Sequence, residues 1–508
     1  MNDELGSIPS AKEPARQEAR HRRALARKRL AVGWCVALAL APSWSAAQSA
    51  PAPGTGTPPV NRITGAAPDA NWEEDYACAV GTTAYVHLFS WLYFSQVRWL
   101  WATKGMAGMS TPLIVPNVLS HQRQPTDARY KDGGRPTVDS TYSATWVDLS
   151  REPMILTVPD MGERYFSVQM VGFNADNFDY VSKRTTGTRA GVYAIVGPHW
   201  KGTLPEGVKA LAPSPTPWAF SLIRIEVRGT ADLPAVARLQ DQIKLEHLSV
   251  YLGKPSETPK YVLVPPVARQ KDPLADWKNI NRALAESPVP AYEAQLAKMY
   301  AQVGIGGGLD VETMSDAVKR GLARAAKLGA AIVTSGPPNN VGRKVVNGWG
   351  MTPPYWGRET IDGHYLIHAA KTLGGFVVHD PQESIYPGTF VDDRGEQLND
   401  SRRYELRFEK GQTPPVNAFW SVTLYGPDYN LVDNPINRYA VSDRTPGVKY
   451  GADGSLTLYI QKDAPSDDRK GNWLPSNHGN FHLVLRTYLP KAEMIEGKWK
   501  PPVVRRVE

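Results

Sequence analysis

Cysteine is nearly absent from this sequence, which holds two cysteines, Cys35 and Cys78, in 508 residues. Cys35 follows Trp34, whereas a lipid-attachment site has a small residue before its cysteine. Cys35 also lies in a short apolar stretch that we expect to be removed, so the mature chain has no internal disulfide. Its stability must come from a buried core, which a chain of this length can form. We expect Cys78 to be a small buried apolar residue rather than a nucleophile.

A large excess of charge of either sign is also lacking. The net charge of +8 includes eight Lys or Arg and four Asp or Glu in residues 1–47, so loss of that segment leaves +4. A mildly basic chain of this kind does not have the strong positive charge that is typical of nucleic-acid binding. We therefore predict no nucleic-acid partner.

Familiar catalytic signatures are missing as well. The sequence has no Gly-x-Ser-x-Gly elbow and no phosphate-binding loop with a lysine, and the glycines of 304–308 separate two helical segments. His364 and His368 are four residues apart on an expected helix, and two histidines at this spacing can coordinate one metal ion. No third ligand is apparent in the sequence. We predict neither a metal nor a cofactor. Serine catalysis stays open, because the members of a triad meet in space and need no sequence signature.

The first 47 residues have the layout of a secretory signal peptide. A basic block at 20–29 precedes an apolar stretch at 30–41, and the small residues 45–47 follow. The apolar stretch is too short to cross a bilayer by itself. We predict cleavage near Ala47 and a periplasmic or secreted protein; an uncleaved segment kept as an anchor is the alternative. Residues 48–70 form an expected extended linker, which contains Pro51, Pro53, Pro58 and Pro59.

The stretch 72–101 is long and apolar, with no Asp, Glu, Lys or Arg between Asp75 and Arg98. Its length would allow a membrane span. Hydroxyl, amide and imidazole groups are scattered through it, however, and these suit a protein interior better than lipid. We predict a buried core helix and no integral membrane span after signal removal, with the span as the alternative.

Two regions have the short alternating apolar runs of β-strands. In the first, runs at 154–158, 164–171, 190–198 and 220–227 predict an antiparallel sandwich, and the turn at 159–162 predicts a hairpin between the first two. In the second, runs from Tyr404 onward, among them 416–425, 456–460 and 481–485, predict another sandwich. Between them, residues 272–334 have apolar residues at helical spacing, and 363–373 predicts one more short helix. We place the boundaries at 71–265, 266–345 and 346–508.

Several motifs resemble those of known families. Arg135-Pro-Thr-Val-Asp139-Ser-Thr-Tyr142-Ser143, followed by Trp146-Val-Asp148-Leu, resembles the Pro-Asn-x-Asp-Thr-x-Tyr-Ser … Asp-Leu signature of domain-of-unknown-function family 1254. Residues 184–187 and 196–200 look like later parts of that pattern. The C-terminal part is similar to domain-of-unknown-function family 1214, through segments 415–421, 437–439, 453–457, 472–475 and 486–488. The resemblance covers roughly residues 71–504.

This resemblance implies a mainly β protein without implying a chemistry. It predicts an N-terminal immunoglobulin-like sandwich, a small helical middle segment and a C-terminal jelly-roll-like sandwich. Thr137 and Ser140 stand where the signature has Asn and Thr, so a role that needs the Asn amide is not carried over. Asp139, Tyr142 and Ser143 match the signature.

Asp139 is the candidate catalytic residue. It lies between a Gly-Gly-Arg-Pro loop and a strand-like run, where an Asp side chain can accept backbone N–H bonds and hold the loop. It could instead act as a general base, or hold an arginine beside an anionic ligand. Tyr142, Arg164 and Arg184 belong to the same cluster as ligand-binding candidates.

Two arginines of the second β region are ligand-binding candidates because of their positions in the strand pattern. Arg486 shares a strand face with His482, Val484 and Tyr488, while the other face is apolar. A guanidinium on such a face needs an acceptor, which could be a carboxylate such as Glu405 or Asp433, or a ligand. We predict that Arg486 either pairs with a carboxylate or opens onto a pocket shared with aromatic side chains. The same reasoning applies to Arg438.

The aromatic residues of this region complete the candidate ligand site. Aromatic side chains in sandwiches are mostly core, but they can also stack on a planar ligand, and Trp420, Tyr425 and Tyr459 are the candidates. Two functions follow. The first is binding of a small polar or anionic molecule by an exported protein, and the alternative is hydrolysis with a carboxylate such as Asp139. Homo-oligomer formation is left open by the sequence.

Overall fold

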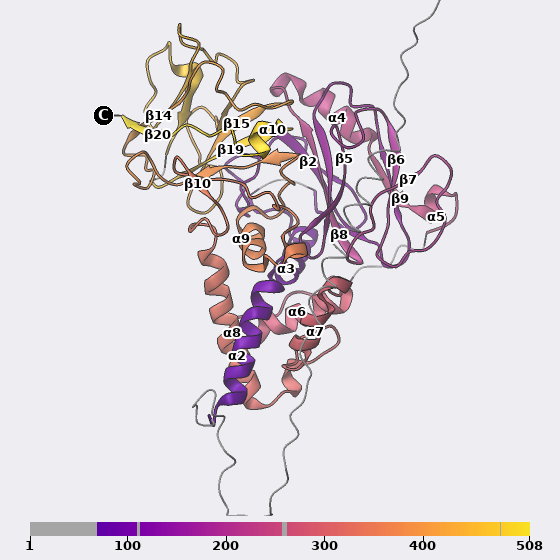
Figure 1. The fold of residues 1–508 in the computed structure, drawn as a ribbon. Helices are drawn as coiled ribbons and strands as arrows, with labels where there is room; N and C mark the ends of the chain where they lie inside the picture. The colour runs from indigo at the N-terminus through magenta and orange to yellow at the C-terminus, as the bar shows by residue number, and fades with distance from the viewer. Residues whose placement is uncertain (1–68, 109–111, 257–261, 478, 508) are drawn as a thin grey trace, which may run out of the picture. The chain divides into compact units, whose positions relative to one another are not determined.

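The structure is a computed structural model that describes residues 69–108, 112–256, 262–477 and 479–507. Asp69–Glu508 forms one compact unit (Figure 1). The predicted signal peptide and nearly all of the predicted linker lie outside the described residues.

Two sheets share a hydrophobic core in the N-terminal half of this unit. Apolar side chains from both sheets, among them Leu156, Val168 and Ile223, are buried in it. The five-stranded sheet has the order β1 (Ser120–His121), β2 (Ser140–Asp148), β8 (Trp218–Glu226), β4 (Phe166–Gly172), β5 (Asn177–Ser182). The four-stranded sheet has the order β7 (Lys209–Ala210), β6 (Gly191–Ile195), β3 (Met154–Val158), β9 (Lys244–His247).

The predicted hairpin between 154–158 and 164–171 is wrong. Strand β3 pairs with β6 and β9, whereas β4 pairs with β5 and β8 in the other sheet. Leu156 of β3 and Val168 of β4 are buried in the same core. Strands whose apolar faces meet across a core belong to opposite layers, so the turn after β3 carries the chain from one sheet to the other.

Two further sheets share a second core, which includes Leu406, Leu458, Leu483 and Leu485. The larger sheet has the order β10 (Val345–Val346), β11 (Trp349–Gly350), β13 (Gly388–Thr389), β19 (His482–Tyr488), β15 (Trp420–Tyr425), β16 (Ala440–Ser442), and β12 (Ser384–Ile385) also pairs with β19. The smaller sheet has the order β18 (Trp473–Pro475), β17 (Leu456–Gln461), β14 (Arg403–Phe408), β20 (Val504–Val507). Except for β6 with β7 and β17 with β18, the pairs are antiparallel. The mainly β architecture with antiparallel sheets is thus confirmed.

Nine α-helices accompany the sheets in the described part of the chain. Those that bear on the site are α2 (Trp72–His87), α3 (Phe89–Thr103), α6 (Ala275–Glu286), α7 (Ala294–Ala301), α8 (Asp316–Ser335) and α9 (Tyr365–Gly375); the others are α4 (Leu233–Gln242), α5 (Leu248–Tyr251) and α10 (Ala492–Ile495). The helices predicted at 272–334 and 363–373 are therefore present.

The apolar stretch 72–101 forms α2 and α3, which meet at Leu88. Tyr85, Trp91 and Phe94 are almost fully buried in a core that also includes Trp277 of α6. The predicted burial in the protein core is confirmed, although the chain makes two helices where one was predicted. Among the described helices, none has the length and apolarity that crossing a membrane requires.

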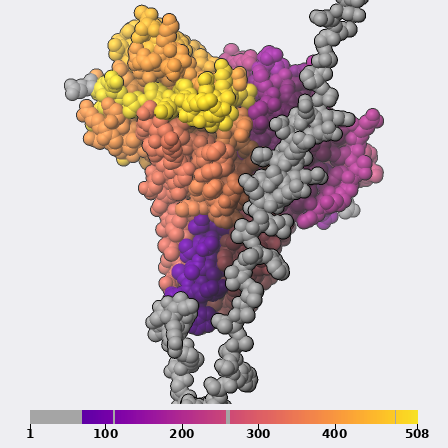
Figure 2. Space-filling view, in the orientation of Figure 1, coloured from indigo at the N-terminus to yellow at the C-terminus, as the bar shows by residue number. Residues whose placement is uncertain are grey.

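Glycines of α8 allow it to pack closely against α2, as Figure 2 shows for the indigo and salmon segments. A Cβ atom at Gly321 would lie 2.3 Å from the carbonyl oxygen of Glu74 and 2.8 Å from Cβ of Ala77. One at Gly329 would lie 2.6 Å from Cβ of Tyr85. Any larger residue at these positions must therefore push the two helices apart.

Replacing Gly321 with alanine is expected to destabilise the protein by about 1 kcal/mol. Alanine favours the helix by about 1 kcal/mol, but forcing the helices apart costs about 1–3 kcal/mol. Urea unfolding would measure the difference, and Lys327→Ala, an exposed change on the same helix, should stay within about 0.5 kcal/mol of the wild type. A stabilised Gly321→Ala protein would contradict the close packing of α2 and α8.

Candidate functional site

A cavity of about 150 Å³ lies where the two β regions and the helices meet. Strands β2 and β8 supply Tyr142 and Arg224, helix α9 supplies Lys371, and β19 supplies Arg486. The Gly-Gly-Arg-Pro loop before β2 adds Arg135, and the segment after α8 adds Arg343. Residues far apart in the sequence thus line one space.

The lining of this cavity carries positive charge without negative charge. Among its described lining residues are five cationic side chains, and none is Asp or Glu. They are Arg135, Arg224, Arg343, Lys371 and Arg486. Lys371 has a carboxylate partner, Glu359, at 2.9 Å. The hydrogen bonds that the structure gives the four arginines go to neutral acceptors instead.

Arg135 and Arg343 use carbonyl and imidazole acceptors. Arg135 donates from Nε to Nε2 of His482 at 2.8 Å and from Nη1 to the carbonyl oxygen of Gly374 at 2.9 Å. Arg343 donates to the carbonyl oxygens of Met351 and Tyr386, at 3.2 and 2.5 Å. Neutral acceptors satisfy the N–H groups but do not compensate the charge.

Burial without a counter-charge lowers the pKa of these guanidinium groups. Burial lowers the pKa of Arg135 to about 10. Burial and the nearby charge of Arg135 lower the pKa of Arg343 to about 9. Both groups stay charged at neutral pH, so an anion in the cavity would offset a desolvation cost that the protein already carries.

Arg486 lies as its strand pattern predicts. Phe481, Leu483 and Leu485 face the second core, and Arg486 lines the cavity on the other side of β19. Its Nη2 donates to the hydroxyl of Tyr425 at 2.8 Å and to the carbonyl oxygen of Arg135, and its buried Nε has no hydrogen-bond partner among the described residues.

The guanidinium carbon of Arg486 lies 5.4 and 5.8 Å from the ring centroids of Tyr386 and Tyr425. The prediction of a pocket shared with aromatic side chains is confirmed. The proposed partners Glu405 and Asp433 are not among the contacts of Arg486.

His482 sits beside Arg135 as a neutral acceptor. Its ring stacks on Phe390 at 4.7 Å and on Tyr425 at 5.6 Å between centroids. Burial, together with the charge of Arg135, holds the pKa of His482 well below its usual value. Because Nε2 accepts the Arg135 hydrogen bond, the ring proton is on Nδ1.

Another part of the cavity lining is aromatic and belongs to the core around the helices. Phe376 lies 4.9 Å from Trp101 and 5.2 Å from Phe220 between ring centroids, and all three line the cavity. Phe376 follows α9 with a φ of 57°, a conformation that non-glycine residues rarely adopt. Such strain costs about 1–3 kcal/mol and persists only where packing enforces it.

Asp139 lies outside the cavity lining, in a contact between the two β regions. One of its carboxylate oxygens accepts hydrogen bonds from the hydroxyls of Ser421 at 2.6 Å and Thr137 at 3.0 Å. The other lies 3.4 Å from Nη2 of Arg444. Thr137, at the position where the family signature has Asn, thus supplies a hydroxyl donor to Asp139. This geometry fits the role of holding the loop, but the donors are side-chain hydroxyl groups and not the backbone N–H groups that were predicted.

The remaining candidates are distributed over the molecule. Tyr142 lines the cavity, and its hydroxyl accepts from the backbone N–H of Thr137 at 2.8 Å. The other arginines have structural partners outside the cavity lining: Arg164 with Asp232 at 2.6 and 2.7 Å, Arg184 with Glu383 at 2.8 Å, and Arg438 with the carbonyl oxygens of Lys470, Gly471 and Trp473.

The aromatic candidates are not part of the cavity lining, although Tyr425 contacts Arg486, which is. Trp420 is buried in the second core, where its ring lies 5.3 Å from Phe408. The guanidinium of Arg469 lies 5.0 Å from the ring centroid of Tyr459. Neither Trp420 nor Tyr459 lines the cavity.

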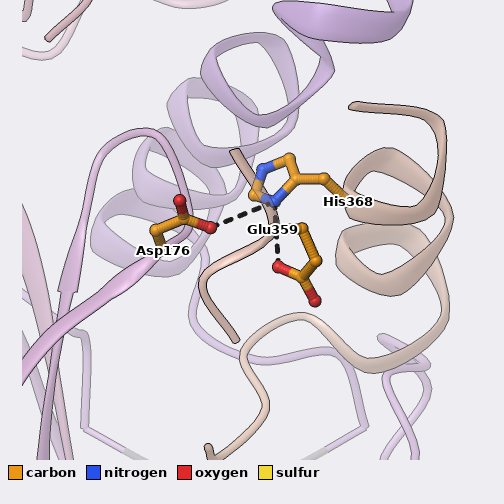
Figure 3. Close-up of side chains that lie close together, drawn as sticks. All are labelled: Asp176, Glu359 and His368. Atoms are coloured by element: carbon orange, nitrogen blue, oxygen red, sulfur yellow. Dashed lines mark hydrogen bonds and ion pairs between the residues drawn. The ribbon is translucent and has the colours of Figure 1, made fainter. Parts of the chain in front are cut away.

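A buried cluster of Asp176, Glu359 and His368 is linked to the cavity through Lys371. Nδ1 of His368 lies 3.3 Å from a carboxylate oxygen of each acid (Figure 3). The residues come from the turn after β4, from a short helical turn at Glu359–Asp362 and from α9. Within the described residues, this is the one group of three such side chains close enough to hold a metal ion.

Lys371 makes a closed ion network the better interpretation of this cluster. Its Nζ lies 2.9 Å from the Glu359 oxygen that also faces His368, and 2.9 Å from the carbonyl oxygen of Ala175. Burial and Lys371 oppose protonation of His368, but the two carboxylates outweigh them and raise its pKa. Burial opposes ionisation of Glu359, yet Lys371 and His368 lower the pKa of this carboxyl to about 2. Two positive and two negative charges then balance without a metal.

The sequence interpretation missed four of the five cavity cations. Arg224 had a usable signal, because it interrupts a run of apolar residues on both faces of β8, where a charge must be buried. Arg135 lies inside the motif that resembles the family 1254 signature, but the motif alone does not show which way the Arg135 side chain points. Arg343 and Lys371 carry no such signal.

Comparison of the chain with known proteins identifies two families and one solved structure that shares its fold. The model of DUF1254, described as a protein of unknown function, matches residues 116–247. The model of DUF1214, described in the same words, matches residues 383–492. The chain carries both families in tandem. The predicted resemblance is thus confirmed in content and order, and no curated protein matches the chain.

Two solved structures are similar to this DUF1254–DUF1214 chain. The VPA0106 protein from Vibrio parahaemolyticus aligns with a TM-score of 0.64 and 23% identity, over 85% of this chain and 100% of that one. A putative uncharacterized protein from Burkholderia cenocepacia aligns with a TM-score of 0.41 and 13% identity, over 86% of this chain and 96% of that one. The Vibrio structure shows a shared fold. The chemistry has to be argued from the cavity itself.

Proposed function

We propose that this protein binds a small anion in the cavity between its two β regions. One observation carries the proposal: five cationic side chains line the cavity, and no described lining residue is acidic. A protein gains no stability from burying unpaired guanidinium groups, so their retention is best explained by a ligand that neutralises them. Planar guanidinium groups also match the geometry of a carboxylate better than a lysine does.

Hydrolysis at Asp139 has no comparable support. A general base needs a free oxygen within reach of the substrate. The Asp139 carboxylate is engaged by Ser421, Thr137 and Arg444 and lies outside the cavity lining. Binding therefore stands as the proposed function.

The proposal also includes two finer statements from the sequence. Export to the periplasm or the medium follows from the pattern of residues 1–47. An immunoglobulin-like N-terminal and a jelly-roll-like C-terminal sandwich follow from the family resemblance. The paired sheets around each of the two β cores support the sandwich part of this statement.

Binding of anions should depend on Arg343. Its guanidinium is charged, lines the cavity and has no acidic partner among the described residues, so Arg343→Met should weaken anion binding by at least about tenfold, the value of one hydrogen bond to a charged group. Isothermal titration calorimetry of the purified full chain with acetate, benzoate and phosphate measures the affinity for each anion, and neutral benzamide serves as the uncharged probe.

Arg407 provides the matched control for that titration. It is an exposed arginine of β14 that contacts Glu409 and Asp453, so Arg407→Met should bind anions as the wild type does. The proposal fails if none of the three anions binds, or if Arg343→Met binds them with wild-type affinity.

A further inference from the structure

We propose that the ligand is a carboxylate whose apolar body is about the size of one six-membered ring. This inference rests on the proposed function and adds the class of anion. It depends on three properties of the cavity: its size, the position of its charges and the nature of its apolar lining.

The size of the cavity sets the limit for the body. At about 150 Å³ it has the volume of an apolar cavity that admits a benzene ring. Two fused rings would nearly fill that volume and leave little room for the carboxylate itself. An inorganic anion or acetate would fill a small part of it and leave the apolar wall without contacts.

Three of the five cationic side chains of the cavity lie close together. Arg486 donates to the backbone of Arg135, and Arg135 lies close enough to Arg343 to lower its pKa. Arg343 donates to the carbonyl oxygen of Tyr386, whose ring lies 5.4 Å from the guanidinium of Arg486. Three guanidinium groups thus lie near one another beside β19.

The hydrogen bonds of these three groups leave donors for a ligand. Arg343 uses Nε and Nη2, and no described acceptor is bonded to its Nη1. Arg486 keeps a buried Nε that has no partner among the described residues. Two donors from different guanidinium groups suit the two oxygens of one carboxylate.

The aromatic part of the lining can receive an apolar ring. Trp101, Phe220 and Phe376 form a cluster of mutually packed rings that belongs to the core of the helices and lines the cavity. Ala144 of β2 belongs to the same core and also lines the cavity, with a side chain of only one carbon. Aromatic side chains contribute edge and face contacts that a flat ring can use. The lining therefore favours a molecule that has both a charged group and an apolar ring.

The decisive experiment compares three carboxylates that differ in their bodies, with phosphate as an inorganic anion. Isothermal titration of the full chain with benzoate, acetate, 2-naphthoate and phosphate should give benzoate the highest affinity, at least about tenfold above acetate. That ratio corresponds to burial of a few ring carbons against the apolar wall. Benzamide should not bind measurably, because it lacks the charge.

Two protein variants test separately the contacts to the charged group and to the apolar ring of the ligand. Arg486→Met should weaken binding of benzoate and acetate alike, by at least about tenfold. Ala144→Leu should fill the apolar wall and weaken benzoate by at least about tenfold while leaving acetate within about threefold. If Ala144→Leu does not fold, Ala144→Val makes a smaller change in the same direction.

The outcomes distinguish the inference from the proposed function. Equal affinity for benzoate and acetate, or a preference for phosphate or naphthoate, would overturn the inference while anion binding itself stands. Absence of binding by all four anions would overturn both. Loss of benzoate binding in Ala144→Leu with acetate retained would support the inference.

Discussion

Replacing Lys371 with methionine is expected to lower the free energy of unfolding by about 3–5 kcal/mol, because the change leaves buried carboxylates without their counter-charge. Methionine fits a space of similar length and is flexible, so the effect reports the lost charge rather than a cavity. The ammonium group of Lys371 is fully buried, as is the Glu359 carboxylate 2.9 Å away. Without Lys371, Glu359 and Asp176 keep the imidazole of His368 as their one cationic neighbour in the cluster.

Urea unfolding followed by tryptophan fluorescence would measure this loss. The double variant Lys371→Met/Glu359→Gln should recover most of the stability, because it removes both charges together. Lys470→Met is the matched control: Lys470 pairs with Asp467 on the surface, and its loss should change stability by less than about 1 kcal/mol.

A chelator gives a second check on the same network. Because Lys371 and the imidazole of His368 already face the two carboxylates, EDTA should leave the wild-type unfolding curve unchanged. A destabilised wild type in EDTA, or a Lys371→Met protein as stable as the wild type, would show that the ion network is the wrong interpretation.

The sequence was a good guide to secondary structure because that information is local. Helical spacing at 272–334 and alternating runs near 154–158 and 456–460 depend on neighbouring residues. Strand partners depend on where a whole layer packs, which is why the hairpin at 159–162 was wrong: alternation shows which face of a strand is buried but not which strand lies beside it.

The site was only partly predictable, for a related reason. Arg486 could be found because a charge on a strand with one apolar face must meet either an acceptor or a cavity. Lys371 could not, because its burial depends on Glu359, which an irregular turn brings beside α9. Arg135 and Arg486 are 351 positions apart, and nothing in either local sequence shows that they meet.

The absence of a third metal ligand in the sequence has the same origin. His364 and His368 suggested a pair on one helix, but the structure puts His364 against the ring of Tyr355, at 4.2 Å between centroids. The groups that face His368 come instead from a turn between strands and from a short helical turn. Spacing within one helix therefore pointed to the wrong partner for His368.

His482 should make the protein lose stability as the pH falls below about 6.5, by about 1.4 kcal/mol for each pH unit. Burial and the charge of Arg135 hold the pKa of the folded-state imidazole well below that of the unfolded chain. The unfolded chain therefore takes up the proton first, and acid favours unfolding. Protonation of Nε2 would also remove the acceptor of the 2.8 Å hydrogen bond from Arg135 and place two cations together.

The test is the difference between two stability profiles, because other groups titrate in the same range. His482→Gln keeps an acceptor for Arg135 but cannot be protonated, so it should lose about 2 kcal/mol less than the wild type between pH 6.5 and pH 5. Urea unfolding at several pH values measures both profiles. His199→Gln, which replaces an exposed histidine, should keep the wild-type pH dependence. Parallel profiles for the wild type and His482→Gln would mean that His482 is not held neutral beside Arg135, and that the cationic part of the cavity lining is less desolvated than its contacts indicate.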